Sequence, residues 1–305
     1  MKNYPLSFVF YRLFLHLYPF PEKENEIYIP DSFLRLLGVL NKVYNSHKRR
    51  NPNDLISFFL NTLHDELNEL KNNKKKIQLK TPNIYDKHNV IKWGVHNFQQ
   101  NNKSIISNIL NWFEIKQLRC TKCFNISYNF QYYNTFELDI LETYKYKNNN
   151  NSITLIECLE YIKNNPKTQT LFCQKCGVYI QISSTSEIIC LSNMIIFSLN
   201  RGDLENDKLI NIPFKLQDRI DLTNLIENKN FVMNNLNYEL VGVVSITKEE
   251  NKNIFVSFCK SPVDQQWYFY KDDVVHQVNL NNVISFHNNG NYIPCILGYK
   301  ALKNN

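Results

Sequence analysis

The chain has 305 residues, of which 43% are hydrophobic and 13% are aromatic. This length allows one large domain or two small ones with a sizeable core. No apolar run reaches the roughly 18 residues of a transmembrane helix, so we expect no membrane contact. The apolar start is interrupted by Arg12 and His16 and no small-residue cleavage site follows, so we expect no signal peptide. Cytoplasm or nucleus is therefore the expected location.

The net charge is +7 with a pI of about 8.8, and the basic residues are spread along the chain with one local cluster at 71–80. A mild basic excess is compatible with an acidic partner or with nucleic acid. A solvated loop explains the cluster more simply, so we do not expect nucleic acid as the main partner.

Helical spacing of apolar residues covers 6–18, and a second helix follows Pro30 from Asp31 to about Ser46. Pro52-Asn53-Asp54 begins a third helix that runs to Leu70, whereas 77–80 and 90–98 are interpreted as short strands or irregular segments. Ser104 starts a further segment. Strand patterns then dominate, with one short helix at 153–163; the strand candidates are 125–140, 171–200, 209–222, 238–247, 253–260, 266–271 and 291–299. Helices followed by a mainly antiparallel half indicate an α+β protein.

Four of the eight cysteines form two Cys-x-x-Cys pairs, Cys120 with Cys123 and Cys173 with Cys176. In a chain without an export signal this spacing indicates metal rather than disulfides. Two such turns can supply four thiolates to one tetrahedral zinc ion, and a closed shell of four ligands makes that zinc structural. Coincidental turns with free thiols are the simpler alternative. The other cysteines are expected to be small core residues: Cys158, Cys190, Cys259 and Cys295.

Several blocks, taken in order, resemble the ubiquitin-specific proteases (USP/UCH-type, papain-like deubiquitinases) over about residues 50–300. They are the Asn53–Leu60 helix, the Ser104-Ile105-Ile106 entry, the two Cys pairs, Met194–Arg201, Ile212–Leu222, Tyr238–Val244 and Cys295–Lys300. The resemblance implies one domain, 1–305, with a thumb at about 1–117, zinc-bearing fingers at 118–200 and a palm at 201–305. It also implies catalysis by Cys, His and an Asp or Asn.

This chain departs from the family at each catalytic position. In the family the nucleophilic cysteine lies upstream of the segment that matches Asp54. In this chain the first cysteine is Cys120, so no cysteine stands at that place. The hairpin at 251–275 should carry the His and its orienting acid on two facing strands. Ile254 stands at the His position and Lys271 at the Asp/Asn position, and only the neighbouring acid, Asp272, is kept. Isoleucine cannot accept a proton, and a lysine offers a cation where an acceptor should orient the His.

Three other residues of the palm have side chains that can take part in acid–base or thiol chemistry: His276, His287 and Cys259. His276 follows the second strand of the hairpin, and we expect His287 to lie in a loop; both are expected to be exposed polar residues. Cys259 lies in an apolar strand and is expected near the core. None of the three is therefore expected to replace the catalytic groups.

The resemblance then favours a USP-like domain without peptidase activity that binds ubiquitin, a ubiquitin-like protein or a scaffold partner. One alternative is an active deubiquitinase whose nucleophile block was lost upstream of Met1 from a truncated gene model. A second alternative is a zinc-containing nucleic-acid-binding module. The basic residues do not cluster on the cysteine turns in the sequence, and no aromatic–basic RNA motif is visible, which disfavours that alternative.

Overall fold

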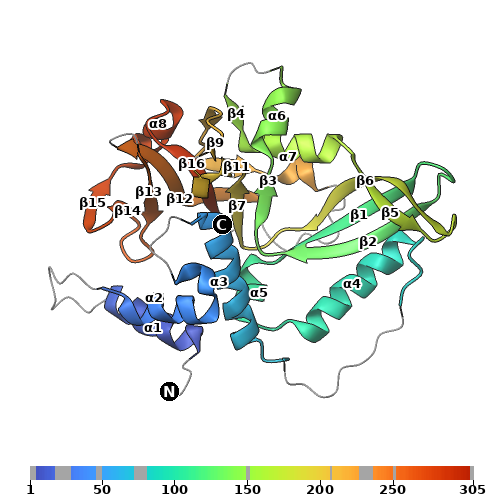
Figure 1. Ribbon diagram of the computed structural model, residues 1–305, viewed down its shortest axis with the longest axis horizontal. Helices are drawn as coiled ribbons and strands as arrows, with labels where there is room; N and C mark the ends of the chain where they lie inside the picture. The colour runs from blue at the N-terminus through green and yellow to red at the C-terminus, as the bar shows by residue number, and fades with distance from the viewer. Residues whose placement is uncertain are drawn as a thin grey trace.

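A computed structural model describes residues 5–17, 29–45, 50–71, 81–148, 152–206, 208–226, 236–249 and 252–302. Three regions are visible in Figure 1: a helical thumb, a palm built on a large sheet, and fingers formed by long strands that project to one side. The expected α+β class is confirmed, because the helices come first and mainly antiparallel sheets follow. No helix among the described residues is long and apolar enough to span a bilayer.

The thumb consists of α1 (Leu6–Leu17), α2 (Asp31–Leu40), a 3-10 turn (Lys42–Tyr44), α3 (Pro52–Leu67) and the short α5 (Ile105–Leu110). Its core contains Leu6, Leu37 and Leu63, surrounded by phenylalanine rings. The carboxylate of Glu66 accepts hydrogen bonds from the backbone N–H groups of Leu6 and Ser7, at 2.8 and 2.7 Å. Because the first N–H groups of a helix have no partner within it, this contact fixes the start of α1 on α3.

The eight-stranded palm sheet is antiparallel except where β3 runs parallel to β7. A side strand, β11 (Arg219–Asp221), pairs with β12. The order of the remaining strands is β15 (Val274–Val278), β14 (Trp267–Lys271), β13 (Lys252–Lys260), β12 (Asn237–Glu249), β16 (Ile293–Ala301), β7 (Met194–Leu199) and β3 (Phe136–Leu138).

The main core lies on the face of the palm sheet that is covered by α6 (Ile140–Tyr146), α7 (Leu155–Asn164) and α8 (Leu280–Asn288). Tyr238 and Tyr299 are fully buried there, and their hydroxyls donate to backbone carbonyls at 2.8 and 2.5 Å. The segments β3, α6, α7 and β7 thus belong to the palm, although they lie inside the range 118–200 that the sequence assigned to the fingers. Chain order cannot show this, because the chain leaves the fingers and returns to them.

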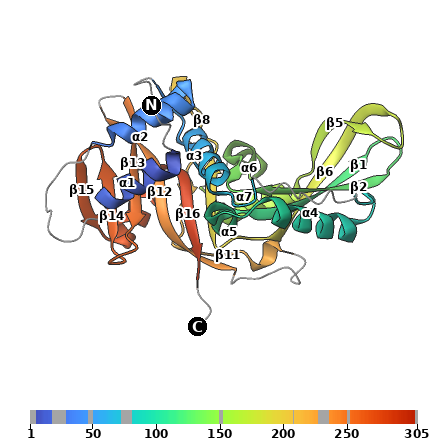
Figure 2. The ribbon, with the colours of Figure 1, turned by 90° about the horizontal axis from the view of Figure 1, so that it is seen from below.

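The fingers are a four-stranded sheet in the order β2 (Ile126–Tyr133), β1 (Trp112–Cys120), β6 (Val178–Cys190) and β5 (Lys167–Cys173). The helix α4 (Lys87–Asn101) runs along one face of this sheet, as both views show (Figures 1 and 2). Gly94 lets the helix approach closely, since a Cβ there would lie 2.2 Å from the ring of Phe130. Trp112, Glu114 and Lys116 lie along β1 toward the opposite face and line a cleft there.

Two sequence predictions are wrong in this part of the chain. Residues 90–98 lie in α4, where Asp86 caps the helix by accepting from the N–H of Asn89 and where Val90, Ile91 and Phe98 are buried on one side. The polar residues between those positions hid the helical spacing. The second helix ends at Leu40, capped at Asn41, rather than at Ser46, which lies outside the described residues. Residues 77–80 also lie outside them.

Short elements connect the palm strands. Phe214–Lys215 (β10) pairs in parallel with Ile153–Thr154 (β4), and Gly202–Asp203 (β8) pairs with Lys208–Leu209 (β9). The predicted strand at 209–222 is therefore divided into β10 and β11 with extended links.

Candidate functional site

The two cysteine turns meet at the tip of the fingers. The Sγ atoms of the two Cys pairs all lie within 4.8 Å of one another, with 3.8 Å between Cys120 and Cys176 and 3.7 Å between Cys123 and Cys173. A tetrahedral ion with Zn–S bonds of about 2.3 Å separates its sulfur ligands by about 3.8 Å, whereas a disulfide would place them about 2 Å apart. The observed separations therefore fit four thiolates around one metal ion.

Both turns have the same backbone geometry. The N–H of Phe124 donates to the carbonyl of Cys120 at 3.0 Å, and the N–H of Gly177 donates to the carbonyl of Cys173 at 2.8 Å. The backbone N–H of Cys123 also hydrogen-bonds toward the Cys120 sulfur and is the main cause that lowers the pKa of Cys120 to about 6. The pKa of Cys176, in contrast, is raised to about 12, mainly by its side-chain hydrogen bond with Cys123, so the clustered sulfurs share protons that a bound metal ion would displace. The predicted ligand set is thus compatible with structural zinc.

The hairpin expected to carry the base and its orienting acid is present. Strands β13 and β14 pair with Ser257 opposite Tyr270, and extending this register by one pair places Lys271 opposite Val256. Side chains two positions apart share a face, so Ile254 and Lys271 lie on the same face of the sheet. Asp272 adopts a left-handed conformation, φ 48°, in the exposed turn to β15.

Lys271 pairs with Glu249, at the end of β12. Strand β13 lies between β12 and β14, and Ile254 belongs to the same face of β13 as both charged residues. The ion pair therefore bridges two strands across the position that the sequence aligns with the family His. Glu249 is the main cause that raises the pKa of Lys271, which keeps the lysine charged. Glu249 was not singled out from the sequence, because only the register brings it there.

The expectation that His287 is exposed in a loop is wrong. His287 lies in α8 and is 3% exposed. Its Nδ1–H donates to the carbonyl of Val283 at 2.6 Å, and its Nε2 accepts from the hydroxyl of Ser245, itself fully buried, at 2.7 Å. Burial lowers the pKa of His287 to about 4. The imidazole is thus neutral, with both nitrogens occupied.

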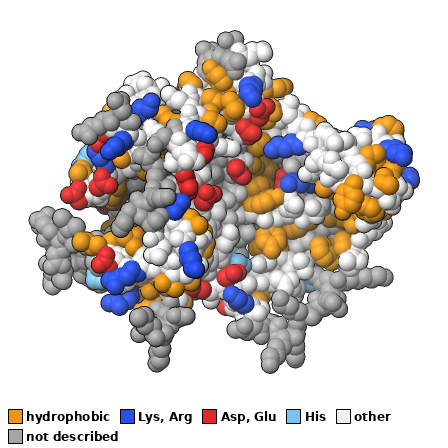
Figure 3. Space-filling view, viewed as in Figure 1, with side chains coloured by type: hydrophobic (Ala, Val, Ile, Leu, Met, Phe, Trp, Pro, Cys, Tyr) orange, Lys and Arg blue, Asp and Glu red, His pale blue; other side chains and the backbone are white. Residues whose placement is uncertain are grey.

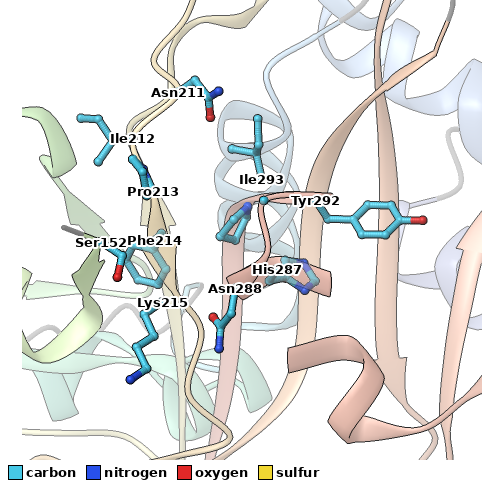
Figure 4. Close-up of a pocket in the computed structure, with 12 residues that line it drawn as sticks. Ser152, Asn211, Ile212, Pro213, Phe214, Lys215, His287, Asn288, Tyr292 and Ile293 are labelled. Atoms are coloured by element: carbon cyan, nitrogen blue, oxygen red, sulfur yellow. The ribbon is translucent and has the colours of Figure 1, made fainter. Parts of the chain in front are cut away.

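A cavity of about 320 Å³ lies beside this imidazole, between the end of α8 and the β10 segment (Figure 4). Phe214, Lys215 and Tyr292 contribute to its wall, and none of the described residues that line it is a carboxylate or a thiol. Because both ring nitrogens of His287 are already bonded, the cavity offers no general base. His276, in contrast, is exposed as expected, on β15 against the ring of Phe269.

The four cysteines outside the metal cluster behave largely as expected. Cys158 and Cys295 are buried, and Cys190 and Cys259 are partly exposed. Burial is the main cause that raises the pKa of Cys158 and Cys295 to about 12 and that also raises the pKa of Cys259. A thiol that stays protonated at neutral pH is a poor nucleophile.

A cleft runs along the palm, from the thumb helix α3 to the finger strands. Its two parts, of about 340 and 270 Å³, share Thr135 and Glu137 on their walls. Near the thumb the described part of the wall carries Asp54 and Glu137, together with hydroxyl and amide side chains. At the fingers the wall carries Glu114, buried and 3.7 Å from the amine of Lys116, and also Lys167. The thumb end of the cleft thus carries two carboxylates, Asp54 and Glu137, whereas the finger end carries Glu114 together with Lys116 and Lys167.

Comparison with known proteins agrees with this architecture. The sequence profile of the family described as ubiquitin carboxyl-terminal hydrolase matches residues 2–297, further toward the N-terminus than the resemblance at about 50–300. Similar solved structures include the SAGA DUB module of Ubp8, Sgf11, Sus1 and Sgf73 bound to monoubiquitin (TM-score 0.67, 16% identity) and the same module bound to ubiquitin aldehyde (TM-score 0.67, 16% identity). The match covers 100% of this chain but only 60% and 61% of those chains.

The likeness to Ubp8, at this identity, concerns the fold, which is the papain-like thumb, fingers and palm that the sequence predicted. The profile covers nearly the whole chain, and the four-thiolate cluster lies at the fingertip, where the resemblance placed zinc. This protein therefore belongs to the ubiquitin carboxyl-terminal hydrolase family.

Proposed function

We propose that this domain binds ubiquitin or a ubiquitin-like protein and does not cleave it. The observation that carries the proposal is the ion pair of Lys271 with Glu249 across Ile254. Cysteine proteases of this type need an imidazole to take the thiol proton and an acceptor to orient that imidazole. Here the first position is aliphatic and the second is a cation that already has a partner.

Restoring a base would not be enough at this site. An imidazolium that forms during catalysis would lie near the charged Lys271, and like charges at short distance disfavour the protonated form. Glu249 could compensate only by giving up its own ion pair. The surrounding strands thus hold a cation, Lys271, at the position where a working Cys–His pair needs a hydrogen-bond acceptor.

The cleft supports retained binding. Asp54 and Glu137 make the thumb side acidic, which suits an extended partner segment with basic side chains. The related Ubp8 structures hold monoubiquitin or ubiquitin aldehyde, which makes ubiquitin the first ligand to test. Their Sgf11, Sus1 and Sgf73 subunits also make a scaffolding role in a larger assembly the natural second candidate.

Titration calorimetry of the zinc-loaded protein with ubiquitin, run beside hydrolysis of a fluorogenic ubiquitin substrate, tests the proposal. We expect binding without turnover. Glu137→Lys should weaken binding at least about tenfold, because it reverses a charge that lines both parts of the cleft. Glu160→Lys makes the same reversal on an exposed position of α7 and should change little.

Each other outcome has a distinct meaning. Turnover, or labelling by a thiol-reactive ubiquitin probe, would refute the loss of activity and favour the deubiquitinase alternative. Absence of both binding and turnover would refute ubiquitin recognition and leave a scaffold that kept the fold.

A further inference from the structure

The outer end of the fingers carries large aromatic side chains that face solvent. Phe124 is 64% exposed, Phe172 51% and Tyr179 74%. The rings of Phe172 and Tyr179 touch edge to face at 5.4 Å between centroids, and the guanidinium of Arg119 lies 5.6 Å from the ring centre of Phe124. Exposed aromatic clusters of this kind are unusual on a surface without a ligand.

Phe124 occupies a backbone position that disfavours it. It has φ 55°, in the left-handed region, where an aromatic residue is an outlier. The equivalent residue of the second cysteine turn is Gly177, with φ 69°. The two turns are otherwise built alike, so glycine would suit both. A phenylalanine that tolerates this strain while exposing its ring is better explained by binding than by folding.

The same end of the molecule is basic. Arg119, Lys122 and Lys175 are exposed, and Lys122 and Lys175 are the third residues of the two Cys-x-x-Cys turns. Segments 117–135 and 167–186 contain no Asp or Glu, and no described carboxylate forms an ion pair with these three cations. Hydrophobic and basic side chains gather there without acidic ones on the visible face (Figure 3). The expectation that basic residues do not cluster on the cysteine turns is therefore wrong: each turn carries one lysine, and the two turns, 49 residues apart in the chain, meet at the fingertip.

A cavity of about 240 Å³ opens beside these residues. Aromatic rings line it, together with amide and hydroxyl groups and one cation, and no carboxylate is among its lining residues. Tyr85, Tyr128 and Phe172 supply the rings, Asn125 and Gln174 supply amides, and Lys175 supplies the charge. A nucleotide matches all three kinds of group: its flat base can stack on the rings, the edges of the base can hydrogen-bond with the amides, and its phosphate can pair with the lysine.

We infer that the fingertip binds single-stranded nucleic acid. Bases stack on the exposed rings and one base enters the cavity, while Arg119, Lys122 and Lys175 neutralise phosphates. An acidic peptide would satisfy the cations, but it would leave three protruding rings without planar partners. A duplex hides its base faces, so the patch discriminates against it. The site is separate from the cleft proposed for ubiquitin.

Fluorescence anisotropy of the zinc-loaded protein with labelled oligo(U) and oligo(dT) tests this inference. We expect binding that is weaker for a duplex of equal length and falls with salt at a logarithmic slope of about −2, as about three single-strand phosphate contacts predict. Lys122→Gln with Lys175→Gln should bring the slope toward about −0.7. Lys215→Gln with Lys300→Gln removes the same charge from exposed palm positions and should leave the slope unchanged.

Phe124→Gly is the decisive variant, because glycine suits the local backbone and should keep zinc content and melting temperature at or above the original. It should weaken binding about 5- to 150-fold, the range for losing one stacked base, with the salt slope unchanged. Tyr179→Ser provides the same test on a strand position, and Tyr146→Ala, an exposed tyrosine of α6, is the control.

Three outcomes would overturn the inference. They are no binding at low salt, equal binding of duplex and single strand, or full displacement by polyglutamate with no effect of either aromatic substitution. The last would show that the patch recognises acidic polypeptides. Glu137→Lys should not weaken oligonucleotide binding, so this test can fail or succeed independently of ubiquitin recognition.

Discussion

Acidification should destabilise this protein through one buried imidazole. His287 has a folded-state pKa of about 4, lowered mainly by burial, against the ordinary value of about 6.5 in an unfolded chain. Between these values the unfolded chain binds a proton that the folded protein excludes, so stability falls as the pH falls. Stability from this group is complete above about pH 6.5 and is lost progressively toward pH 4.

The magnitude follows from the two pKa values. The loss should be about 2 kcal/mol at pH 5 and about 3 kcal/mol at pH 4, relative to pH 7. His287→Gln removes the titration while keeping a donor for the Val283 carbonyl and an acceptor for the Ser245 hydroxyl. We expect the substitution to lower the free energy of unfolding by about 1–2 kcal/mol at pH 7, because its hydrogen bonds are poorer. The stability of the variant should then depend less on acid than that of the original protein.

Urea unfolding of both proteins from pH 7.5 to 4.5 measures this difference. Both proteins share every other group that takes up protons in acid, so the difference in unfolding free energy isolates His287. His88→Gln makes the same substitution on an exposed position of α4 and is the matched control. A difference that stays flat within about 0.5 kcal/mol between pH 7 and pH 5 would show that the imidazole is not held neutral.

Three further predictions concern the metal, the thumb and the fingers. Cys173→Ser should abolish stoichiometric zinc, which contributes about 10 kcal/mol or more in structural sites, and should open the fingertip to protease; a variant that keeps one zinc per chain by elemental analysis would refute the cluster. Glu66→Ala should lower the free energy of unfolding in urea by about 1–3 kcal/mol, because it leaves two helix N–H groups without their acceptor. Glu69→Ala removes a carboxylate from an exposed ion pair and should cost under about 1 kcal/mol. Equal costs would contradict the capping role of Glu66. Gly94→Ala should destabilise by about 1–3 kcal/mol despite better helix propensity, and Phe130→Leu in the same chain should recover part of the loss; simple additivity would contradict the contact.

Local sequence patterns predicted much of the fold. Pro52 after Asn51 marked the start of α3, and the alternating apolar residues of 238–247 and 253–260 marked two central palm strands. The two Cys-x-x-Cys pairs predicted which four sulfurs come together, because each pair fixes its own turn. These features depend on neighbours within a few residues, so the chain shows them directly.

The spacing of apolar residues did not predict two helices, because polar residues interrupt their helical periodicity. The helix α4 was missed because Lys92 and His96 separate its buried positions, and α8 was missed because asparagines surround Val283. His287 was consequently placed in a loop. Burial of these residues depends on the sheet that each helix covers, which no local window contains.

The sequence by itself determined the family, the α+β class and the four cysteine positions, and it predicts that Ile254 and Lys271 stand at the family's His and acid positions. Only the tertiary structure decided what surrounds these two positions, because strand register brings Glu249 to Lys271 across a third strand. It also brought Lys122 and Lys175 to one surface. Side chains distant in sequence meet only after hairpins pair and turns converge, so contacts of this kind follow from strand register and packing rather than from spacing along the chain.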